Sequence, residues 1–227
     1  MPNVPQLIRS VTQKTQVQQY IVEKDYALSY LLAAINHVDG LGENLVLKGG
    51  TALKKLYFAN YRFSEDLDYS TRVMGPIKQI DSLMETVVHS MDEMLNERGP
   101  FQVGLEPLLL KQPHPGEQKV YLVRIQFPEQ RQPLCRLKVE ITVTEPILTP
   151  VEIRPVLHGF AEEIDVRIPV YSLAEITTEK LRALLQSKAR LQERGWGAIT
   201  IQRNFHAISS SCRQSISRGC AGLGFAY

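Results

Sequence analysis

Two aspartates stand one residue apart in the chain, at Asp66 and Asp68. On a β-strand, side chains two residues apart point to the same face of the sheet and lie about 7 Å from one another. Carboxylates held side by side repel one another unless a cation lies between them. Mg²⁺ is such a cation, because it binds one or two carboxylates and completes its coordination with water and substrate phosphates. The pair therefore predicts a site for Mg²⁺ or Mn²⁺.

A glycine-rich turn precedes the aspartates, at Gly49, Gly50 and Thr51, and it follows the short apolar run of residues 45–47. Glycine allows a backbone to approach a phosphate closely, and the N–H groups at the start of a helix can bind that phosphate. Thr51 can add its hydroxyl and N–H groups, and Ser64 can hold the loop beside the acids. Each motif alone is a weak signal, but a strand, a glycine turn, a helix and paired acids in this order suit nucleotidyl transfer. A P-loop is not expected, because the sequence contains no G-x-x-x-x-G-K-[ST] pattern.

This order of motifs resembles the first motif of the DNA polymerase β-like nucleotidyltransferases. It is more closely similar to the AbiEii/AbiGii toxin family, whose members carry a K-G-G-T-x-L…R-F-S-x-D-[LI]-D block. Three further segments agree with that family. V-E-K-D-Y at 22–26 resembles its N-terminal E-K-D-[YW] helix, L-K-V-E-I at 137–141 its basic-x-acid strand, and T-T-E-K-L-R-A at 177–183 its E-K-[LI]-x-A-L helix. The resemblance covers about residues 20–192.

The resemblance implies roles for two further residues. Glu140, on the polar face of an alternating strand, is the candidate third carboxylate, which in a two-metal scheme binds the second ion or accepts the proton of the attacking hydroxyl. The family also fits a shorter acid at this position. Lys180 is expected to reach the triphosphate and to offset the charge that develops on the pyrophosphate leaving group. Without these motifs, Glu140 would be an exposed strand residue and Lys180 a helix-surface lysine, whereas Lys48 and Arg62 are expected to be structural partners of the acids.

The composition of the 227-residue chain, with 44% hydrophobic residues, is that of a globular protein with one large domain or two small ones. A net charge of +2 gives no general case for nucleic-acid binding. No apolar run is long enough to predict a membrane span, and residues 1–16 lack the apolar segment of a secretory signal. The three cysteines show no metal-ligand spacing, and their odd number argues against a disulfide framework. A cytoplasmic location is therefore expected.

The apolar periodicity predicts an α/β (α+β) fold, and the resemblance implies a polymerase-β-like nucleotidyltransferase core with a small mixed sheet flanked by helices. Residues 1–170 are expected to form this core with its N-terminal helix, residues 171–197 the start of an atypical or truncated helical C-terminal part, and residues 198–227 an atypical tail. Residues 1–17 are expected to be an arm or a short helix, and residues 146–164 to be irregular. The expected helices are 18–37, 51–58, 77–97 and 173–192 after an N-cap at Ser172, and the expected strands are 45–47, 66–70, 101–110, 119–127, 135–144 and 166–170.

The tail at residues 198–227 differs in composition from the rest of the chain, because it contains three Arg but no Lys, Asp or Glu. The resemblance implies an R-D-x-x-D-[LI] block after the T-E-K helix, with acids that help to complete the active site. The chain continues instead with L-Q-E-R-G-W-G. We hypothesise that the reading frame shifts near Gly197, so that the natural helical bundle is missing; a divergent but genuine C-terminus is the alternative. Reading the coding DNA in its other two frames distinguishes them.

Three functions are compatible with these motifs. The resemblance implies a metal-dependent enzyme that transfers a nucleoside monophosphate from a nucleoside triphosphate to an acceptor hydroxyl, with an RNA such as tRNA as the expected acceptor. It also implies a role as the toxin of a toxin–antitoxin or phage-abortive system, together with a cognate antitoxin. The first alternative is a catalytically impaired relative that binds nucleotide or antitoxin, which the missing acidic block favours. The second alternative is an antibiotic-modifying nucleotidyltransferase.

Overall fold

The computed structural model describes residues 3–73, 77–109 and 117–194. The chain forms two compact units, of which the first comprises Met1–Ile147 and Val151–Val170. The second comprises Leu148–Pro150 and Tyr171–Tyr227. The hypothesis that the reading frame shifts near Gly197 concerns residues that lie outside the described part of the chain.

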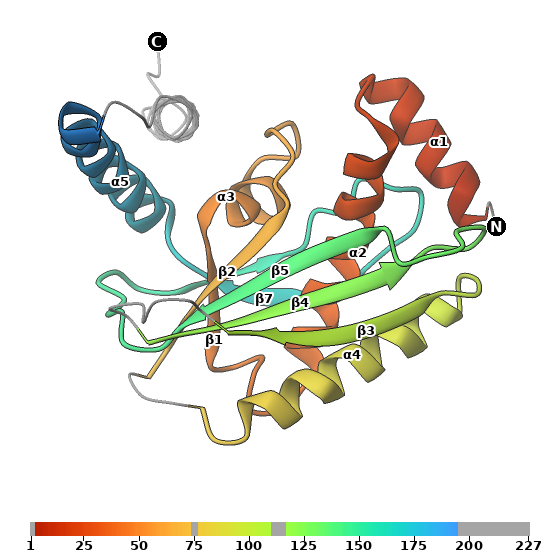
Figure 1. The fold of residues 1–227 in the computed structure, drawn as a ribbon, viewed down its shortest axis with the longest axis horizontal. Helices are drawn as coiled ribbons and strands as arrows, with labels where there is room; N and C mark the ends of the chain where they lie inside the picture. Colours follow the sequence, from red (N-terminus) through yellow and green to blue (C-terminus); the bar gives the residue numbers. More distant parts are fainter. Residues whose placement is uncertain (1–2, 74–76, 110–116, 195–227) are drawn as a thin grey trace, which may run out of the picture. The chain divides into compact units, whose positions relative to one another are not determined.

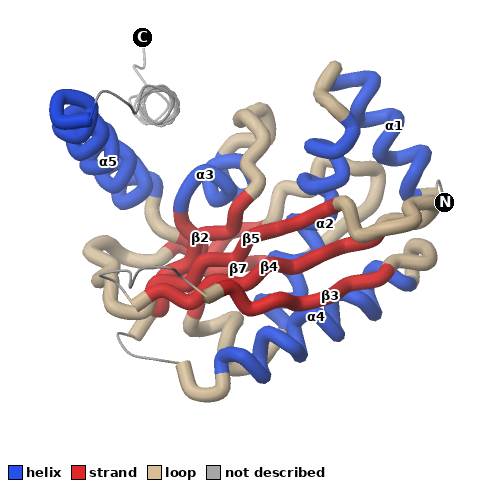
Figure 2. The backbone as a smooth tube through the Cα atoms, viewed as in Figure 1, coloured by secondary structure: helices blue, strands red, loops and turns tan. Residues whose placement is uncertain are grey.

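The first unit is built on one mixed sheet, which in the described residues has seven strands in the order β3-β4-β5-β2-β1-β7-β6 (Figures 1 and 2). The β2–β5 and β1–β7 pairs are parallel, and the other neighbours are antiparallel. This arrangement confirms the predicted mixed sheet. The strands are β1 (Leu45–Lys48), β2 (Asp66–Thr71), β3 (Gln102–Leu108), β4 (Gln118–Gln126), β5 (Cys135–Thr142), β6 (Glu152–Pro155) and β7 (Arg167–Val170).

Strand β5 alternates in burial as its sequence predicts. Leu137, Val139 and Ile141 are fully buried, whereas Lys138 and Glu140 are only partly covered. Since neighbouring side chains on a strand point to opposite faces, the apolar residues line the core and the charged pair lies on the other face. The period of two thus places Glu140 on the face of the sheet that solvent and ligands can reach.

Helix α2 (Gln19–His37) is the central helix of the first unit and packs against α1 (Val4–Thr15), α4 (Ile80–Asn96) and β5. The sequence predicts an amphipathic helix here, but α2 is buried on nearly all sides, including Ser29 and Ala33. The reason is that several elements surround it, so that small and polar residues are covered along with the apolar stripe. Helix α4 lies along β3 (Figure 2).

Of the two forms expected for residues 1–17, an arm or a short helix, the structure has the helix, whereas the segment expected to be irregular contains a strand. Residues 4–15 form the regular helix α1, whose first turn is closed by a capping box between Asn3 and Gln6. Within the segment expected to be irregular, β6 pairs with β7 along the edge of the sheet. An edge strand of four residues that ends in a proline has too few alternating positions to be recognised from its sequence.

In the second unit, helix α5 (Leu173–Arg194) begins at the predicted N-cap. The Ser172 hydroxyl oxygen accepts a hydrogen bond from the backbone N–H of Glu175 at 3.1 Å, which confirms the predicted cap. Within the described ranges of the chain, no helix has the length and apolar character needed to cross a membrane.

Candidate active site

The glycine turn lies directly after β1, as helix α3 (Gly49–Ala52), and continues as the π-helical turn η1 (Leu53–Tyr57). Gly49 has a φ of +81°, a conformation that favours glycine. A β-carbon at this position would lie 2.5 Å from Oδ2 of Asp68. The absence of a side chain at residue 49 therefore allows the backbone to lie directly against the aspartate carboxylate.

Gly50 faces a different set of atoms. A β-carbon at residue 50 would lie 3.0 Å from the Ser64 hydroxyl oxygen and 3.4 Å from Nη2 of Arg62. Both are hydrogen-bond donors, and the guanidinium is positively charged. Gly49 thus faces the Asp68 carboxylate, and Gly50 faces the Ser64 and Arg62 donors.

Thr51 fixes the turn to the strand that carries the acids. Its side chain is buried, and its hydroxyl donates a hydrogen bond to the backbone carbonyl of Asp66. The sequence predicts that this hydroxyl binds a phosphate, whereas in the structure it donates its hydrogen bond to the backbone of β2. Thr51 therefore connects the two halves of the candidate site.

The three predicted carboxylates come from two neighbouring parallel strands. Asp68 on β2 aligns with Glu140 on β5, and Asp66 aligns with Lys138. Aligned and alternate residues share one face, so the strand pairing brings Asp66, Asp68 and Glu140 to the same side of the sheet. Glu140 forms an ion pair with Lys138. In the described part of the chain, no group of three His, Cys, Asp or Glu residues is close enough to hold a metal ion.

The electrostatics of this face reflect the crowding of acids. The pKa of Asp66 is raised, first by desolvation even though the residue as a whole is exposed, and then by the carboxylates of Glu140 and Glu65, while Lys138 and Lys24 oppose the rise. The pKa of Lys138 is raised, chiefly by its hydrogen bond to Glu140. Crowded carboxylates gain from a neighbouring cation. Two aspartates with oxygen donors only are a set that fits Mg²⁺, which needs one or two carboxylates.

Helix α2 connects to both halves of the site through two lysine–acid pairs. Lys24 pairs with Glu65, the residue before Asp66. Asp25 pairs with Lys55 of the η1 turn, with Nζ 2.8 Å from Oδ2. These contacts explain the charged residues of the E-K-D-Y segment, to which the sequence assigned no role. Their partners lie some thirty to forty residues away, so no local pattern could have revealed them.

Two basic residues beside the motif were expected to pair with its acids. Lys48 pairs with Glu145, which lies outside the motif. For Arg62 the prediction is wrong: within the described residues it makes no ion pair with a carboxylate. Its Nη1 instead donates to the carbonyl of Phe63 at 3.2 Å, and its guanidinium lies 5.6 Å from the centre of the Tyr61 ring.

Lys180 lies on α5 in the second unit, at partial exposure. Its contact with a triphosphate stays a prediction.

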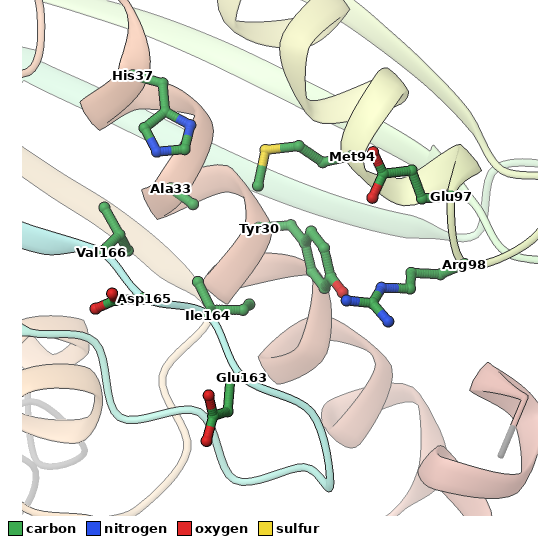
Figure 3. Close-up of a pocket in the computed structure, with 10 residues that line it drawn as sticks. All are labelled: Tyr30, Ala33, His37, Met94, Glu97, Arg98, Glu163, Ile164, Asp165 and Val166. Carbon is green, nitrogen blue, oxygen red and sulfur yellow. The ribbon is translucent and has the colours of Figure 1, made fainter. Parts of the chain in front are cut away.

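A separate cavity of about 170 Å³ lies in the first unit between α2, α4 and residues 163–166 (Figure 3). Tyr30 lines it from α2 and Arg98 from the turn after α4, and the Arg98 guanidinium reaches toward the Tyr30 hydroxyl. None of the predicted site residues lines this cavity. The glycine turn and the acids on β2 and β5 therefore remain the candidate site.

The mixed sheet, the glycine turn after β1 and the paired acids on β2 are the features that the sequence predicts for a nucleotidyltransferase. The chain matches the family model described as "Nucleotidyl transferase AbiEii toxin, Type IV TA system" over residues 30–195. The chain therefore belongs to the AbiEii family of nucleotidyltransferase toxins, and the family resemblance is confirmed.

A solved structure with a similar fold is MenT4, a nucleotidyltransferase toxin from Mycobacterium tuberculosis H37Rv. The two share 23% sequence identity at a TM-score of 0.57, over 78% of this chain and 58% of that one. This chain thus aligns with little more than half the length of MenT4, and at this identity the likeness concerns the fold alone. Comparison with curated proteins gives no match.

Proposed function

We propose that this protein is a metal-dependent nucleotidyltransferase toxin that transfers a nucleoside monophosphate from a nucleoside triphosphate to an acceptor hydroxyl. The observation that carries the proposal is the contact between Gly49 and Asp68. A backbone turn without a side chain lies against one of two paired carboxylates, so that a phosphate on the turn and a cation on the acids are neighbours.

The proposed reaction assigns each residue one task. Asp66 and Asp68 bind Mg²⁺ or Mn²⁺, which supplies Lewis-acid polarisation of the phosphate oxygens. Gly49, Gly50 and Thr51 bring backbone N–H groups to the triphosphate. The acceptor oxygen attacks the α-phosphorus, the bond to the pyrophosphate oxygen breaks, and the hydroxyl proton passes to Glu140. Lys180 then neutralises charge on the departing pyrophosphate.

We further propose an RNA such as tRNA as the acceptor, a cognate antitoxin as the protein partner, and the cytoplasm as the place of action. Membership of a family of toxin–antitoxin toxins supports the antitoxin and a role in abortive infection. The RNA acceptor rests on the family resemblance, and an RNA end offers the free hydroxyl that the reaction requires.

Label transfer tests the proposal directly. The protein is incubated with each α-labelled nucleoside triphosphate, Mg²⁺ and total cellular RNA, beside the Asp66→Ala/Asp68→Ala variant. Asp165→Ala is the matched control, because Asp165 is an exposed aspartate on the segment before β7, away from the β2 acids in the sequence. Label on RNA with the wild type and the control, but not with the double variant, is the expected result.

A second candidate is a catalytically impaired relative that still binds nucleotide or antitoxin. The observation that favours it is the absence of an R-D-x-x-D block after the T-E-K helix. A folded protein that binds nucleoside triphosphate but transfers no label, and does not arrest growth when expressed, would support this candidate over the enzyme. A drug-resistance phenotype would instead support an antibiotic-modifying transferase.

A further inference from the structure

We propose that Arg62, whose guanidinium lies beside Gly50, binds the β- and γ-phosphates of the nucleoside triphosphate. The inference rests on the proposed nucleotidyl transfer and adds a residue to it. The sequence places Arg62 four residues before Asp66 and predicts only a structural role for it. In the structure its guanidinium lies beside the glycine turn.

Two donors converge on one point beside Gly50. The Ser64 hydroxyl oxygen and Nη2 of Arg62 lie 3.0 Å and 3.4 Å from the position that a β-carbon of residue 50 would occupy. Because residue 50 is glycine, no atom of its own fills that position. That position is a covalent bond length from the Gly50 α-carbon and is not itself a ligand position; the two distances show instead that a neutral and a charged donor lie beside the backbone of the turn, which is the kind of environment that a phosphate bound to the turn requires.

The Arg62 guanidinium is already oriented for this contact. Nη1 is held by the carbonyl of Phe63, and the guanidinium carbon lies 5.6 Å from the centre of the Tyr61 ring. Tyr61 is itself buried, so the ring provides a firm surface on one side. With no carboxylate partner among the described residues, the charge of Arg62 is available to an anion. A guanidinium fixed in advance loses little conformational entropy when it binds a phosphate.

The two glycines place this anion site next to the proposed cation site. Gly49 lies against the carboxylate of Asp68, and Gly50 faces Arg62 and Ser64. Consecutive α-carbons are about 3.8 Å apart. A triphosphate that shares some oxygens with a metal ion on the acids therefore extends its remaining oxygens toward the donors. Arg62 neutralises the part of the triphosphate that the metal ion does not reach, and this part becomes the pyrophosphate.

Equilibrium binding of inorganic tripolyphosphate separates the phosphate contact from contacts with the base. The full chain is titrated with Mg²⁺-tripolyphosphate, and in parallel with each of the four Mg²⁺-nucleoside triphosphates. Arg62→Gln is expected to bind both probes roughly 10- to 100-fold more weakly, because a charged hydrogen-bond donor is lost. Arg62→Lys is expected to lie between the two, since it keeps the charge but not the paired donors. Arg9→Gln is the control, because Arg9 is an exposed arginine on α1.

Gly50→Ala provides a second test, which leaves Arg62 in place and also bears on the contact proposed for the Gly50 backbone. Its methyl group occupies the point where the two donors converge, and the φ of Gly50 lies outside the left-handed region, so alanine can adopt this backbone. It is expected to weaken tripolyphosphate binding at least about tenfold without unfolding the chain. Thermal unfolding of every variant is measured, because a purely structural role of Arg62 would lower the melting temperature without a specific loss of tripolyphosphate affinity.

The outcomes distinguish this inference from the proposed function. If the wild type binds neither probe, the proposed function fails and the inference fails with it. If the wild type binds both probes and folded Arg62→Gln or Gly50→Ala binds tripolyphosphate equally well, the inference is overturned while the proposed function stands. Should Arg62→Gln not fold, Arg62→Lys decides between these results, because it changes Arg62 alone and keeps its charge.

Discussion

The Asp25–Lys55 pair yields a sharp prediction, because it is an ion pair with almost no access to solvent. The exposed fractions of the two side chains are 6% and 1%. Lys55 Nζ lies 2.8 Å from both Oδ2 and the backbone carbonyl of Asp25 and 3.0 Å from the Ser29 hydroxyl, so each of its three protons has a partner. The pair fixes the η1 turn, which follows the glycines, to the central helix α2.

Removal of one partner leaves the other charge buried without compensation. Lys55→Met and Asp25→Asn should each lower the free energy of unfolding by about 3–5 kcal/mol. A domain is typically stable by only about 5–15 kcal/mol, so each variant loses a large fraction of its stability. The double variant Asp25→Leu/Lys55→Met should be more stable than either single-charge variant, with a coupling energy of at least about 2 kcal/mol, because no charge is then left buried.

The stability deficit of Asp25→Asn should also depend on pH. Burial lowers the pKa of Lys55 and the charge of Asp25 partly restores it. Between this lowered pKa and the unfolded value of about 10.4, the unfolded chain binds more protons than the folded one, so stability rises with pH. Removal of the Asp25 charge lowers the folded pKa further and extends this window toward neutral pH. The deficit should therefore be largest where Lys55 is protonated in the folded state of both proteins, and it should shrink as the pH rises to the lowered pKa of the wild-type lysine.

Urea unfolding followed by circular dichroism measures these values for the wild type, both single variants and the double variant. Lys54→Met is the control, because Lys54 is the neighbouring lysine, its ammonium donates to the carbonyl of Ala59 and lies over the Phe63 ring, and Asp25 acts on it through space without a hydrogen bond. It should cost less than about 1 kcal/mol. Single variants no less stable than this control, or a coupling energy below about 1 kcal/mol, would refute the reasoning.

Two further predictions follow from the glycine turn and from the buried cysteine. Gly49→Ala should abolish label transfer and destabilise the chain by roughly 1–2 kcal/mol or more, because its φ is +81° and its methyl group would collide with Asp68. Gly104→Ala on β3 is the control, since its methyl group has open space and should change stability by less than about 0.5 kcal/mol. Retained transfer by Gly49→Ala would contradict the proposed contact. Burial raises the pKa of Cys135 to about 12, so its thiol should resist alkylation at pH 8 until urea unfolds the chain, as followed by mass spectrometry of the peptide that contains it; alkylation of the folded protein at the rate of a free thiol would argue against this burial.

The order of the site along the chain could be predicted from the sequence, because it depends on local patterns. The apolar run of β1, the glycine turn and the alternating residues of β5 each carry a short-range signal that the structure reproduces. Alternation alone placed Glu140 on the polar face, and a serine alone marked the start of α5.

The contacts that hold the site together could not be predicted in the same way. Lys55 has the sequence context of a solvent-exposed helical lysine, and only the packing of α2 against η1 shows that it is buried. The ion pair joins Lys138 and Glu140 on one face of β5, and the alignment of β2 with β5 places Asp66 and Asp68 beside them. Such pairings depend on the tertiary structure, which no periodicity encodes.

The parallel pairing of β2 with β5 also has a consequence for the order of events during folding. Asp68 and Glu140 are aligned in space, yet β3 and β4 are inserted between their strands in the sequence. Closing so long a loop costs chain entropy before the new strand contacts repay it, so pairings of this kind form slowly. A ribosome that has released the chain only as far as β2 has made both aspartates but not the strand that completes their face. Synthesis itself therefore delays the assembly of the acidic face until β5 has emerged.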